Sequence, residues 1–335
     1  MSTFWVECGY IEKLNYFQNP DFMANNKKPG VLKMIRAPFL SSILAPLFAG
    51  ILLSYSINGG LNVVGVILVI IIGIGLHIAT NVYNDIYDTI QGTDKVNVHR
   101  NESSGGSGVL QDFPELMPKM FFIARTSLVI ALVGTVILTF FIEKELWPVL
   151  WALYLLSAFF SKYYTAPPVK LAYRGLGEVS VWLAFGPMAI LIAAVSQNIG
   201  FHPQVVLLMS ATGLSTLSIL IVGQLIDVDA DRKGGKHGVA SRFGTRATSY
   251  IYLFVQLAIV LNVVLLFASF SGKSWPLLLA LIPYLLLFPK AASITLKHHN
   301  NEDELKKGAK LTVLTHIVFS FFLVLGLIIY NVLLF

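Results

Sequence analysis

The stretch Asn81-Val-Tyr-Asn-Asp-Ile-Tyr-Asp-Thr-Ile-Gln-Gly-Thr-Asp94 gives the first indication of what kind of protein this is. It closes an apolar run that begins near Leu61 and is long enough to cross a bilayer. On a helix, Asn81 and Asp85 are four residues apart and Asp85 and Asp88 are three apart, so all three project from one face. Carboxylates at the end of a membrane helix are costly unless a cation meets them. The stretch therefore predicts a cation bound at this end of a membrane span.

The composition of the whole chain is that of a polytopic membrane protein. Of its 335 residues, 56% are hydrophobic and only 13% are charged, whereas soluble domains carry about a quarter charged residues. The formal net charge of +6 suggests a nucleic-acid partner at first sight. The basic residues lie in short loops between apolar runs, however, which indicates membrane topology and no nucleic-acid binding. The single cysteine, Cys8, excludes an intramolecular disulfide and a cysteine-based metal site.

Apolar runs of about 20 residues predict an all-α fold with nine transmembrane helices. They lie near residues 38–57, 61–83, 119–142, 146–164, 177–197, 204–226, 247–270, 275–293 and 311–334. Of the 24 basic residues, 22 fall in the N-terminal region or in alternate connections, and only Lys144 and Lys273 fall on the other side. The positive-inside rule then places the N-terminus in the cytosol and the C-terminus outside the cell membrane.

The N-terminal region is predicted to form a unit of its own. Residues 1–35 are polar and aromatic, and they form a cytosolic or interfacial tail to which we assign no chemistry. Glu7, Glu12 and Lys13 precede any apolar core, so this region is not predicted to be a secretory signal peptide. Residues 36–335 form the membrane domain.

A second acidic cluster follows the sixth predicted span. In Gln224-Leu-Ile-Asp-Val-Asp-Ala-Asp-Arg-Lys-Gly-Gly-Lys236, Asp227 and Asp231 are four residues apart and share a helix face, whereas Asp229 points elsewhere. Both clusters close an even-numbered span, so both are predicted to face the cytosol. They also occupy matching places in the first and second groups of four helices, as in a parallel internal repeat.

Two carboxylate clusters that face one cavity repel each other unless divalent cations lie between them. Magnesium fits, because it takes oxygen ligands and typically joins one or two carboxylates to phosphate oxygens. The predicted substrate is therefore a diphosphate, although each aspartate taken singly could also be a solvated helix end. Basic side chains near the clusters are candidates to neutralise the phosphate charge. They are Lys95, Lys162, Arg174, Arg232 and Lys236.

Two connecting loops and one histidine leave their alternatives open. The backbone amides of residues 105–109, Gly-Gly-Ser-Gly-Val, either cradle phosphate or form a flexible turn. Tyr163, Tyr164 and Tyr173 either stabilise an allylic cation through their rings or anchor the chain at the membrane interface. His77 lies one turn before Asn81, where a hydrogen-bonded interior residue is expected more often than a base.

These residues resemble the UbiA superfamily of intramembrane prenyltransferases. The resemblance rests on Asn81-x3-Asp85-x2-Asp88 and on Asp227-x3-Asp231, and it spans about residues 33–335 from the Arg36-Ala-Pro38 motif onward. Within the superfamily the chain is most similar to the 1,4-dihydroxy-2-naphthoate polyprenyltransferases of menaquinone biosynthesis. That similarity rests on three segments, residues 84–94, residues 105–110 and residues 164–178 with the following Phe185-Gly-Pro187.

The chain also departs from the family pattern in two places. Many relatives carry an aspartate four residues after Asp88, where this chain has Gly92, with Asp94 two residues further on. After the second motif the usual Gly-Lys-Arg/Ser-Thr is Gly235-Lys-His-Gly238 here. These departures put the contributions of Asp94 and His237 in question.

The resemblance implies nine helices around a central cavity with a lateral opening to lipid. It implies a magnesium-dependent enzyme that transfers a polyprenyl group from a polyprenyl diphosphate to an aromatic acceptor, here 1,4-dihydroxy-2-naphthoate. Two magnesium ions would be held by Asp85, Asp88, Asp227 and Asp231. Substrate contacts would come from Asn81, Asn84, Lys95, Arg232 and Lys236, and the candidate catalytic residues are Lys162, Tyr163, Tyr164, Tyr173 and Arg174.

Other readings of the same residues stay open at this point. The acceptor could be 4-hydroxybenzoate, a haem or a glyceryl phosphate lipid. The paired acidic clusters could belong to a cation-coupled transporter, although the interiors of the predicted spans lack Asp and Glu. A catalytically silent prenyl-lipid binding protein is a third reading, and the intact acidic motifs argue against it.

Overall fold

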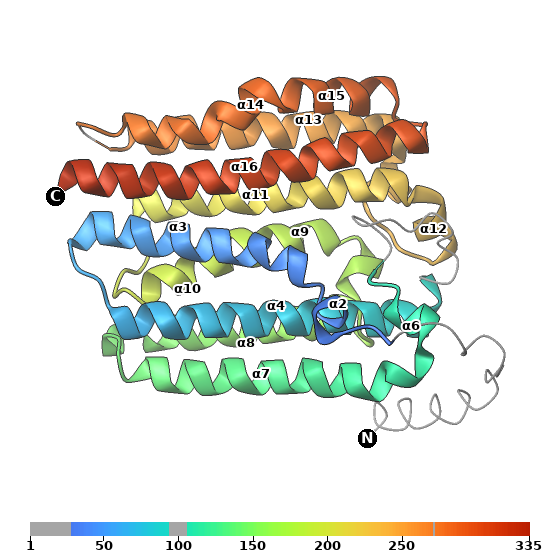
Figure 1. The fold of residues 1–335 in the computed structure, drawn as a ribbon, viewed down its shortest axis with the longest axis horizontal. Helices are drawn as coiled ribbons and strands as arrows, with labels where there is room; N and C mark the ends of the chain where they lie inside the picture. The colour runs from blue at the N-terminus through green and yellow to red at the C-terminus, as the bar shows by residue number, and fades with distance from the viewer. Residues whose placement is uncertain (1–27, 94–105, 271) are drawn as a thin grey trace.

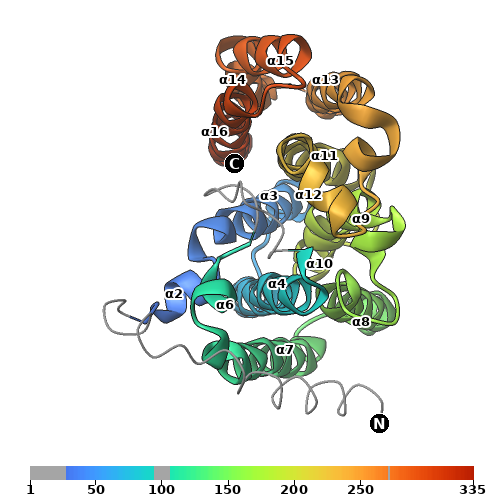
Figure 2. The same cartoon turned by 90° about the vertical axis from the view of Figure 1, so that its right-hand side faces the viewer.

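The structure is a bundle of helices that lie side by side along one axis (Figure 1). The computed structural model describes residues 28–93, 106–270 and 272–335, and every regular element in this part of the chain is helical. Viewed along the bundle axis, α3, α4, α10 and α11 lie in the middle of the bundle, and α7, α8, α13, α15 and α16 lie toward its outside (Figure 2).

The helices have the following bounds. The long ones are α3 (Ser41–Asn58), α4 (Val63–Gln91), α7 (Met117–Thr139), α8 (Trp147–Tyr163), α11 (Pro203–Ile226), α13 (Val239–Ala268) and α16 (Glu302–Leu334). Two further spans are divided: α9 (Gly177–Leu183) continues through a π-helical segment into α10 (Ala189–Val195), and a 3-10 segment from Trp275 leads into α14 (Ile282–Leu286) and α15 (Phe288–Lys297). Three short helices, α2 (Val31–Met34), α6 (Val109–Asp112) and α12 (Val228–Lys233), lie at one end of the bundle (Figure 1).

Eight helical segments of the described chain are long and apolar enough to cross a membrane. They correspond to eight of the nine predicted spans. The remaining predicted span, 146–164, coincides with α8, which has 17 residues. At a rise of about 1.5 Å per residue it is about 25 Å long, a few ångströms less than the roughly 30 Å of a bilayer core.

Large apolar side chains cover the outside of the bundle, as expected of a surface that faces lipid. Phe122, Phe140, Phe254 and Leu285 are each more than two-thirds exposed, and such a concentration is unusual for a soluble protein. Together with the eight spans, these side chains show a multi-pass membrane protein.

The two acidic motifs lie at the same end of the bundle because of how α4 and α11 end. The sequence predicts that the second span ends near residue 83, but α4 continues to Gln91, so the first motif occupies its last turns. Gly92 ends this helix with φ 84°, a left-handed conformation that glycine adopts without strain. The helix α11 ends at Ile226, and Asp227 then starts the short helix α12.

The N-terminal tail predicted at residues 1–35 is described only from residue 28. Its last residues are not detached from the bundle, because Met34 and Ile35 pack into a cluster of buried side chains from α4, α6 and α7. The last two residues of the predicted tail are therefore held against the bundle by apolar packing.

A close contact between two glycines brings the α9–α10 segment against α11. A Cβ atom on Gly186 would lie 2.2 Å from the carbonyl oxygen of Met209 and 2.9 Å from the Cα atom of Gly213. Gly186 belongs to the π-helical segment Ala184–Met188, which contains Pro187. Such segments often occur at functional sites, and this one carries Phe185 into the interior of the bundle.

We expect that Gly186→Ala lowers the stability of the bundle by about 1–3 kcal/mol, because the added methyl group has no space against α11. The thermal midpoint of the detergent-solubilised protein measures this effect. Gly60→Ala is the matched control, since nothing lies within 4 Å of a Cβ atom at that position. Equal midpoints for the two variants would contradict the close packing described here.

Candidate active site

A polar cavity lies at the end of the bundle that carries both acidic motifs. Its volume is about 250 Å³, and its wall includes side chains from α4, α11, α12 and the loop after α12. Asp88 comes from the first motif, and Asp227 and Asp231 come from the second. The structure thus brings residues that are 139 or more positions apart in the chain to one cavity, as the two motifs predict.

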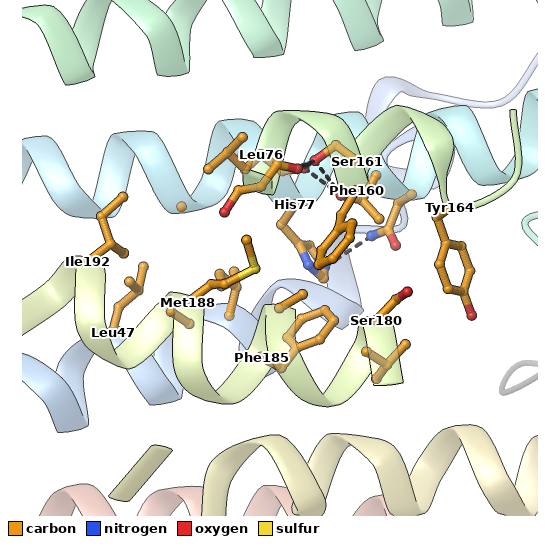
Figure 3. Close-up of a pocket in the computed structure, with 18 of the residues that line it drawn as sticks. Leu47, Leu76, His77, Phe160, Ser161, Tyr164, Ser180, Phe185, Met188 and Ile192 are labelled. Atoms are coloured by element: carbon orange, nitrogen blue, oxygen red, sulfur yellow. Dashed lines mark hydrogen bonds between the residues drawn. The ribbon is translucent and has the colours of Figure 1, made fainter. Parts of the chain in front are cut away.

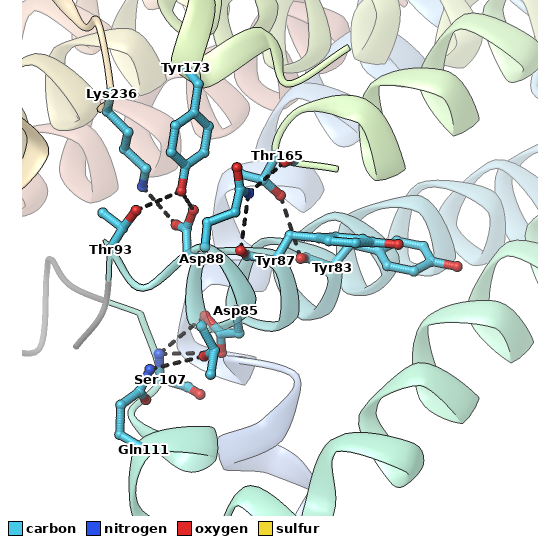
Figure 4. Close-up of polar contacts among 12 residues, drawn as sticks. Tyr83, Asp85, Tyr87, Asp88, Thr93, Ser107, Gln111, Thr165, Tyr173 and Lys236 are labelled. Carbon is cyan, nitrogen blue, oxygen red and sulfur yellow. Dashed lines mark hydrogen bonds and ion pairs between the residues drawn. The ribbon is translucent and has the colours of Figure 1, made fainter. Parts of the chain in front are cut away.

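Asp88 is the centre of a hydrogen-bond network in this cavity (Figure 4). The ammonium group of Lys236 donates to one carboxylate oxygen at 2.7 Å, and the hydroxyl of Tyr173 donates to the other at 2.7 Å. The Thr93 hydroxyl lies 2.7 Å from that of Tyr173, and since Tyr173 donates to Asp88, Thr93 donates to Tyr173. Asp88 is only 3% exposed, so its charge depends on these partners.

Asp85 is turned away from the polar cavity and does not line it. Its two carboxylate oxygens accept from the backbone N–H of Ser107 at 3.2 and 3.3 Å (Figure 4). Arg36 lies 3.9 Å from one of them. The loop amide that was predicted to cradle phosphate or form a turn therefore binds a carboxylate of the protein itself.

Arg36 is a cavity residue to which the sequence assigned no role. It lines the polar cavity and has φ 54°, which is uncommon for a residue other than glycine. The Arg36-Ala-Pro38 motif offered a signal, because the family resemblance begins there. Its charge gave no such signal, because Arg36 is one of several basic residues in the N-terminal region that indicate membrane topology.

Lys236 and Asp231 face each other across the cavity and shift each other's titration. Burial lowers the pKa of Lys236, but Asp88 and Asp231 attract its positive charge and hold the pKa well above its usual value. Burial raises the pKa of Asp231 to about 7; Lys236 opposes this rise, and Asp227 and Asp88 add to it. Lys236 is thus charged at neutral pH, and Asp231 gains or loses its proton there.

Asn81 and Asn84 lie on the wall between the polar cavity and the bundle interior. The amide nitrogen of Asn81 lies 3.0 Å from Nε2 of His77, so the hydrogen-bonded reading of that histidine is confirmed. The side-chain oxygen of Asn84 is buried and has no hydrogen-bond partner among the described residues. A buried amide oxygen without a donor marks a place where a ligand, an ion or water is expected.

A second, apolar cavity of about 170 Å³ adjoins the polar one (Figure 3). The two share the side chains of His77, Asn81, Asn84, Tyr164, Val181 and Phe185. The apolar cavity extends from there between α3, α4, α8 and the α9–α10 segment. Its large lining side chains beyond the shared ones are apolar, among them Ile43, Leu76, Phe160 and Met188. A polar chamber at the membrane surface therefore continues into an apolar one.

Several predicted site residues do not reach these cavities. Arg174 is exposed and donates to the Pro168 carbonyl at 2.9 Å, and Arg232 is exposed on α12. Lys162 lies over the ring of Tyr163 at 5.7 Å, and neither residue lines either cavity. Of the predicted catalytic residues, Tyr164 lines both cavities and Tyr173 binds Asp88. Lys95 and Asp94 lie outside the described residues.

The residues on the polar cavity suit magnesium. Among the described residues, no group of three or more His, Cys, Asp and Glu side chains is close enough to hold a metal by itself. Magnesium does not require such a group, because it is usually held by one or two carboxylates together with waters and substrate phosphates. Asp88, Asp227 and Asp231 supply carboxylate oxygens, and the unpartnered oxygen of Asn84 adds a neutral one.

Fold and site together define a helical membrane protein with an acidic cavity above an apolar one. The family model of the UbiA prenyltransferases matches residues 43–314 of this chain. The chain therefore belongs to the UbiA prenyltransferase family and is a prenyltransferase, and the resemblance found in the sequence is confirmed.

The curated relatives are distant. The chain is 26% identical over 220 residues to the 2-carboxy-1,4-naphthoquinone phytyltransferase of Synechocystis, a match that covers 66% of this chain and 68% of that protein. It is 28% identical over 207 residues to the 1,4-dihydroxy-2-naphthoate octaprenyltransferase of Mycobacterium leprae, covering 61% of this chain and 66% of that protein.

The fold also matches solved structures. One is a UbiA homolog from Archaeoglobus fulgidus bound to DMAPP and Mg²⁺, with a TM-score of 0.55 and 15% identity. That match covers 88% of this chain and 98% of the other. At this identity the likeness shows the helical fold.

We expect magnesium to bind more weakly as the pH falls, because a proton on Asp231 competes with the metal. With a pKa of about 7 for this carboxyl, the apparent affinity is expected to be about tenfold lower at pH 6 than at pH 8. Calorimetric titration of the purified protein with Mg²⁺ measures it. Asp229→Asn should keep this dependence, since Asp229 is exposed. An affinity that does not change between these pH values would contradict the placement of Asp231 at the metal.

Proposed function

We propose that this protein transfers a polyprenyl group from a polyprenyl diphosphate to 1,4-dihydroxy-2-naphthoate, with magnesium, in menaquinone biosynthesis. One observation carries the proposal: both acidic motifs and Lys236 line a cavity that continues into an apolar one. A prenyl diphosphate has the same division, with a highly charged head and a hydrocarbon tail. Its head suits the polar cavity and its tail the apolar one.

In this proposal Asp88, Asp227 and Asp231 hold the magnesium ions, with Asn81 and Asn84 beside them. Two ions fit the number of carboxylates and the charge of a diphosphate. Asp85 is the fourth ligand predicted from the sequence, but its carboxylate is paired with Arg36 and Ser107. We therefore propose that Asp85 acts by holding Arg36 and the loop at Ser107 beside the cavity.

Bound magnesium would draw negative charge from the leaving diphosphate. Lys236 and Arg36 line the same cavity, and they add positive charge where negative charge develops on the diphosphate oxygens. The bond between the allylic carbon and the diphosphate oxygen breaks, and the oxygen keeps the electron pair. Tyr164, on the wall shared by both cavities, places an aromatic ring near the resulting allylic cation.

The aromatic acceptor then supplies the electrons for the new bond. The ring carbon that bears the carboxylate attacks the allylic cation, and carbon dioxide leaves without its bonding electrons, which restores the aromatic ring. The apolar walls limit the water that would otherwise capture the cation. Tyr173 donates to Asp88, and because burial raises its pKa above the usual value it stays protonated.

The acceptor is assigned from the curated relatives. Its support is the naphthoate-related activity in the names of the curated relatives, at 26–28% identity. Other acceptors in the superfamily, such as 4-hydroxybenzoate, a haem or a glyceryl phosphate lipid, are the alternative. The basic side chains of Arg36 and Lys236 suit an anionic acceptor, but all of these compounds carry a carboxylate or a phosphate.

We also propose how the chain lies in the membrane. The apolar helix α8 lies alongside α4 and is counted as the ninth span, tilted little because it is short. The charge distribution supports a cytosolic position for the acidic end of the bundle and for the N-terminus, with the C-terminus outside the cell membrane. Residues 36–335 are then one nine-helix domain around the two cavities.

A reaction with a panel of acceptors tests the activity. The full chain in nanodiscs, with Mg²⁺ and labelled farnesyl diphosphate, is expected to prenylate 1,4-dihydroxy-2-naphthoate and to release diphosphate only with an acceptor that it uses. Transfer to another acceptor alone would overturn the naphthoate assignment. No diphosphate release with any acceptor would overturn the prenyl transfer.

We expect Asp231→Asn to lower turnover by about 100-fold or more, since it removes a charged group that acts on the transition state through the metal. Asp229→Asn is the matched control two residues away, and it is expected to keep wild-type turnover because Asp229 is exposed. Initial rates at saturating Mg²⁺ measure both variants, and equal rates would refute the metal assignment.

A further inference from the structure

The lining of the apolar cavity ends at buried side chains, and its length can be read from the helices that line it. On α4 its lining runs from Asn84 at the polar end to Gly73 at the inner end, a separation of eleven positions. At about 1.5 Å per position this is about 16 Å. The α9–α10 segment runs alongside from Val181 to Ile192, again a separation of eleven positions. Two helices therefore give nearly the same length.

Leu47 and Ile192 form the inner wall. Both are buried, with 0% and 4% exposure, and Figure 3 shows them at the end of the cavity opposite Tyr164. A Cβ atom on Gly73 would lie 2.5 Å from a methyl carbon of Leu47, so this leucine lies directly against the backbone of α4. Beyond it, Val69 and Ile72 are fully buried in the main core and line neither cavity.

From this geometry we propose that the apolar cavity encloses three isoprene units of the donor, and that Leu47 and Ile192 limit the length of the tail. Carbon–carbon single bonds are about 1.5 Å long, so an extended four-carbon isoprene repeat advances about 5 Å. Three repeats fill about 15 Å of the 16 Å available. The inference rests on the proposed function and adds the donor class: a short allylic diphosphate of the farnesyl type, in preference to an octaprenyl one.

A groove between α3 and α16 is the competing route for a longer tail. It is lined by Leu44, Ala45, Ile317 and Phe321 and has a volume of about 350 Å³. It shares no residue with the polar cavity. A wide opening lies between them, and its wall combines Lys33 and Arg36 with apolar side chains such as Leu32, Phe39 and Val313. The apolar cavity shares six residues with the polar one. We assign the tail to the apolar cavity because it adjoins the polar cavity directly, whereas the groove is reached only through this opening.

A competition between donors tests the proposal. The full chain in nanodiscs receives Mg²⁺, 1,4-dihydroxy-2-naphthoate and equimolar geranyl, farnesyl, geranylgeranyl and octaprenyl diphosphates, and mass spectrometry measures each product. The wild type is expected to favour farnesyl over octaprenyl by about tenfold or more, because even one methylene that does not fit changes selectivity by about 10-fold or more.

Two variants change the inner wall in opposite directions. Leu47→Ala lengthens the cavity and should raise the ratio of geranylgeranyl to farnesyl product several-fold. Ile192→Phe shortens it and should raise the ratio of geranyl to farnesyl product. Leu44→Ala is the matched control on the same helix, since Leu44 lines the groove and not the cavity, and it should leave all ratios unchanged. Ratios within one sample do not depend on how much of a variant is folded.

The outcomes separate this inference from the proposed function. Equal use of farnesyl and octaprenyl donors, with ratios that neither wall variant changes, would overturn the length limit while prenyl transfer stands. Ratios that respond to Leu44→Ala alone would place the tail in the groove and also overturn it. No transfer from any donor would overturn the proposed function and the length limit with it.

Discussion

The ion pair between Asp88 and Lys236 is the interaction on which the site depends. It joins the last turn of α4 to the loop after α12, two parts of the chain that are 148 positions apart. Asp88 is buried and Lys236 is only partly exposed, and two opposite charges largely removed from water are stable only with good geometry and further hydrogen bonds. Tyr173 supplies one such bond to Asp88, and Thr93 supports Tyr173 in turn. The same ammonium group also faces Asp231, so one lysine compensates charge from both acidic motifs.

This arrangement explains how a strongly acidic cavity is stable without its substrate. Lys236 reduces the repulsion among the carboxylates of the two motifs. The pKa of Asp231 is raised mainly by burial, and Asp227 and Asp88 add to the rise. A site with unbalanced negative charge attracts divalent cations. A diphosphate that binds with them can replace Asp88 as the partner of Lys236. Below this polar end the helices α3, α4 and α8 and the α9–α10 segment enclose an apolar volume. The bundle thus places a charged chamber and a hydrocarbon chamber in direct contact.

The sequence predicted the parts of this structure that depend on local pattern. Apolar runs predicted the spans, and the four-residue spacing of Asp227 and Asp231 predicted that both face the same side. Both predictions use residues that lie close together in the sequence. The sequence placed Asn81, Asp85 and Asp88 on one helix face but ended the span near residue 83, because the residues that follow are polar, whereas α4 extends to Gln91. Two features of the site depend on packing between distant segments. One is the contact of Asp85 with Arg36 and Ser107. The other is that Lys236, among five basic candidates, is the residue that pairs with Asp88. The inner wall at Leu47 and Ile192 arises in the same way, from the contact of Leu47 with Gly73 across two helices.

The central claim is that one prenyl diphosphate spans both cavities, with its head between the acidic motifs and its tail against Leu47 and Ile192. The most direct measurement is an experimental structure of the full chain with Mn²⁺ and the unreactive analogue farnesyl thiodiphosphate. The account predicts metal density between Asp88 and Asp231, Lys236 on a phosphate oxygen, and a tail that ends at Leu47. A diphosphate bound outside the polar cavity, or a tail in the groove between α3 and α16, would contradict it.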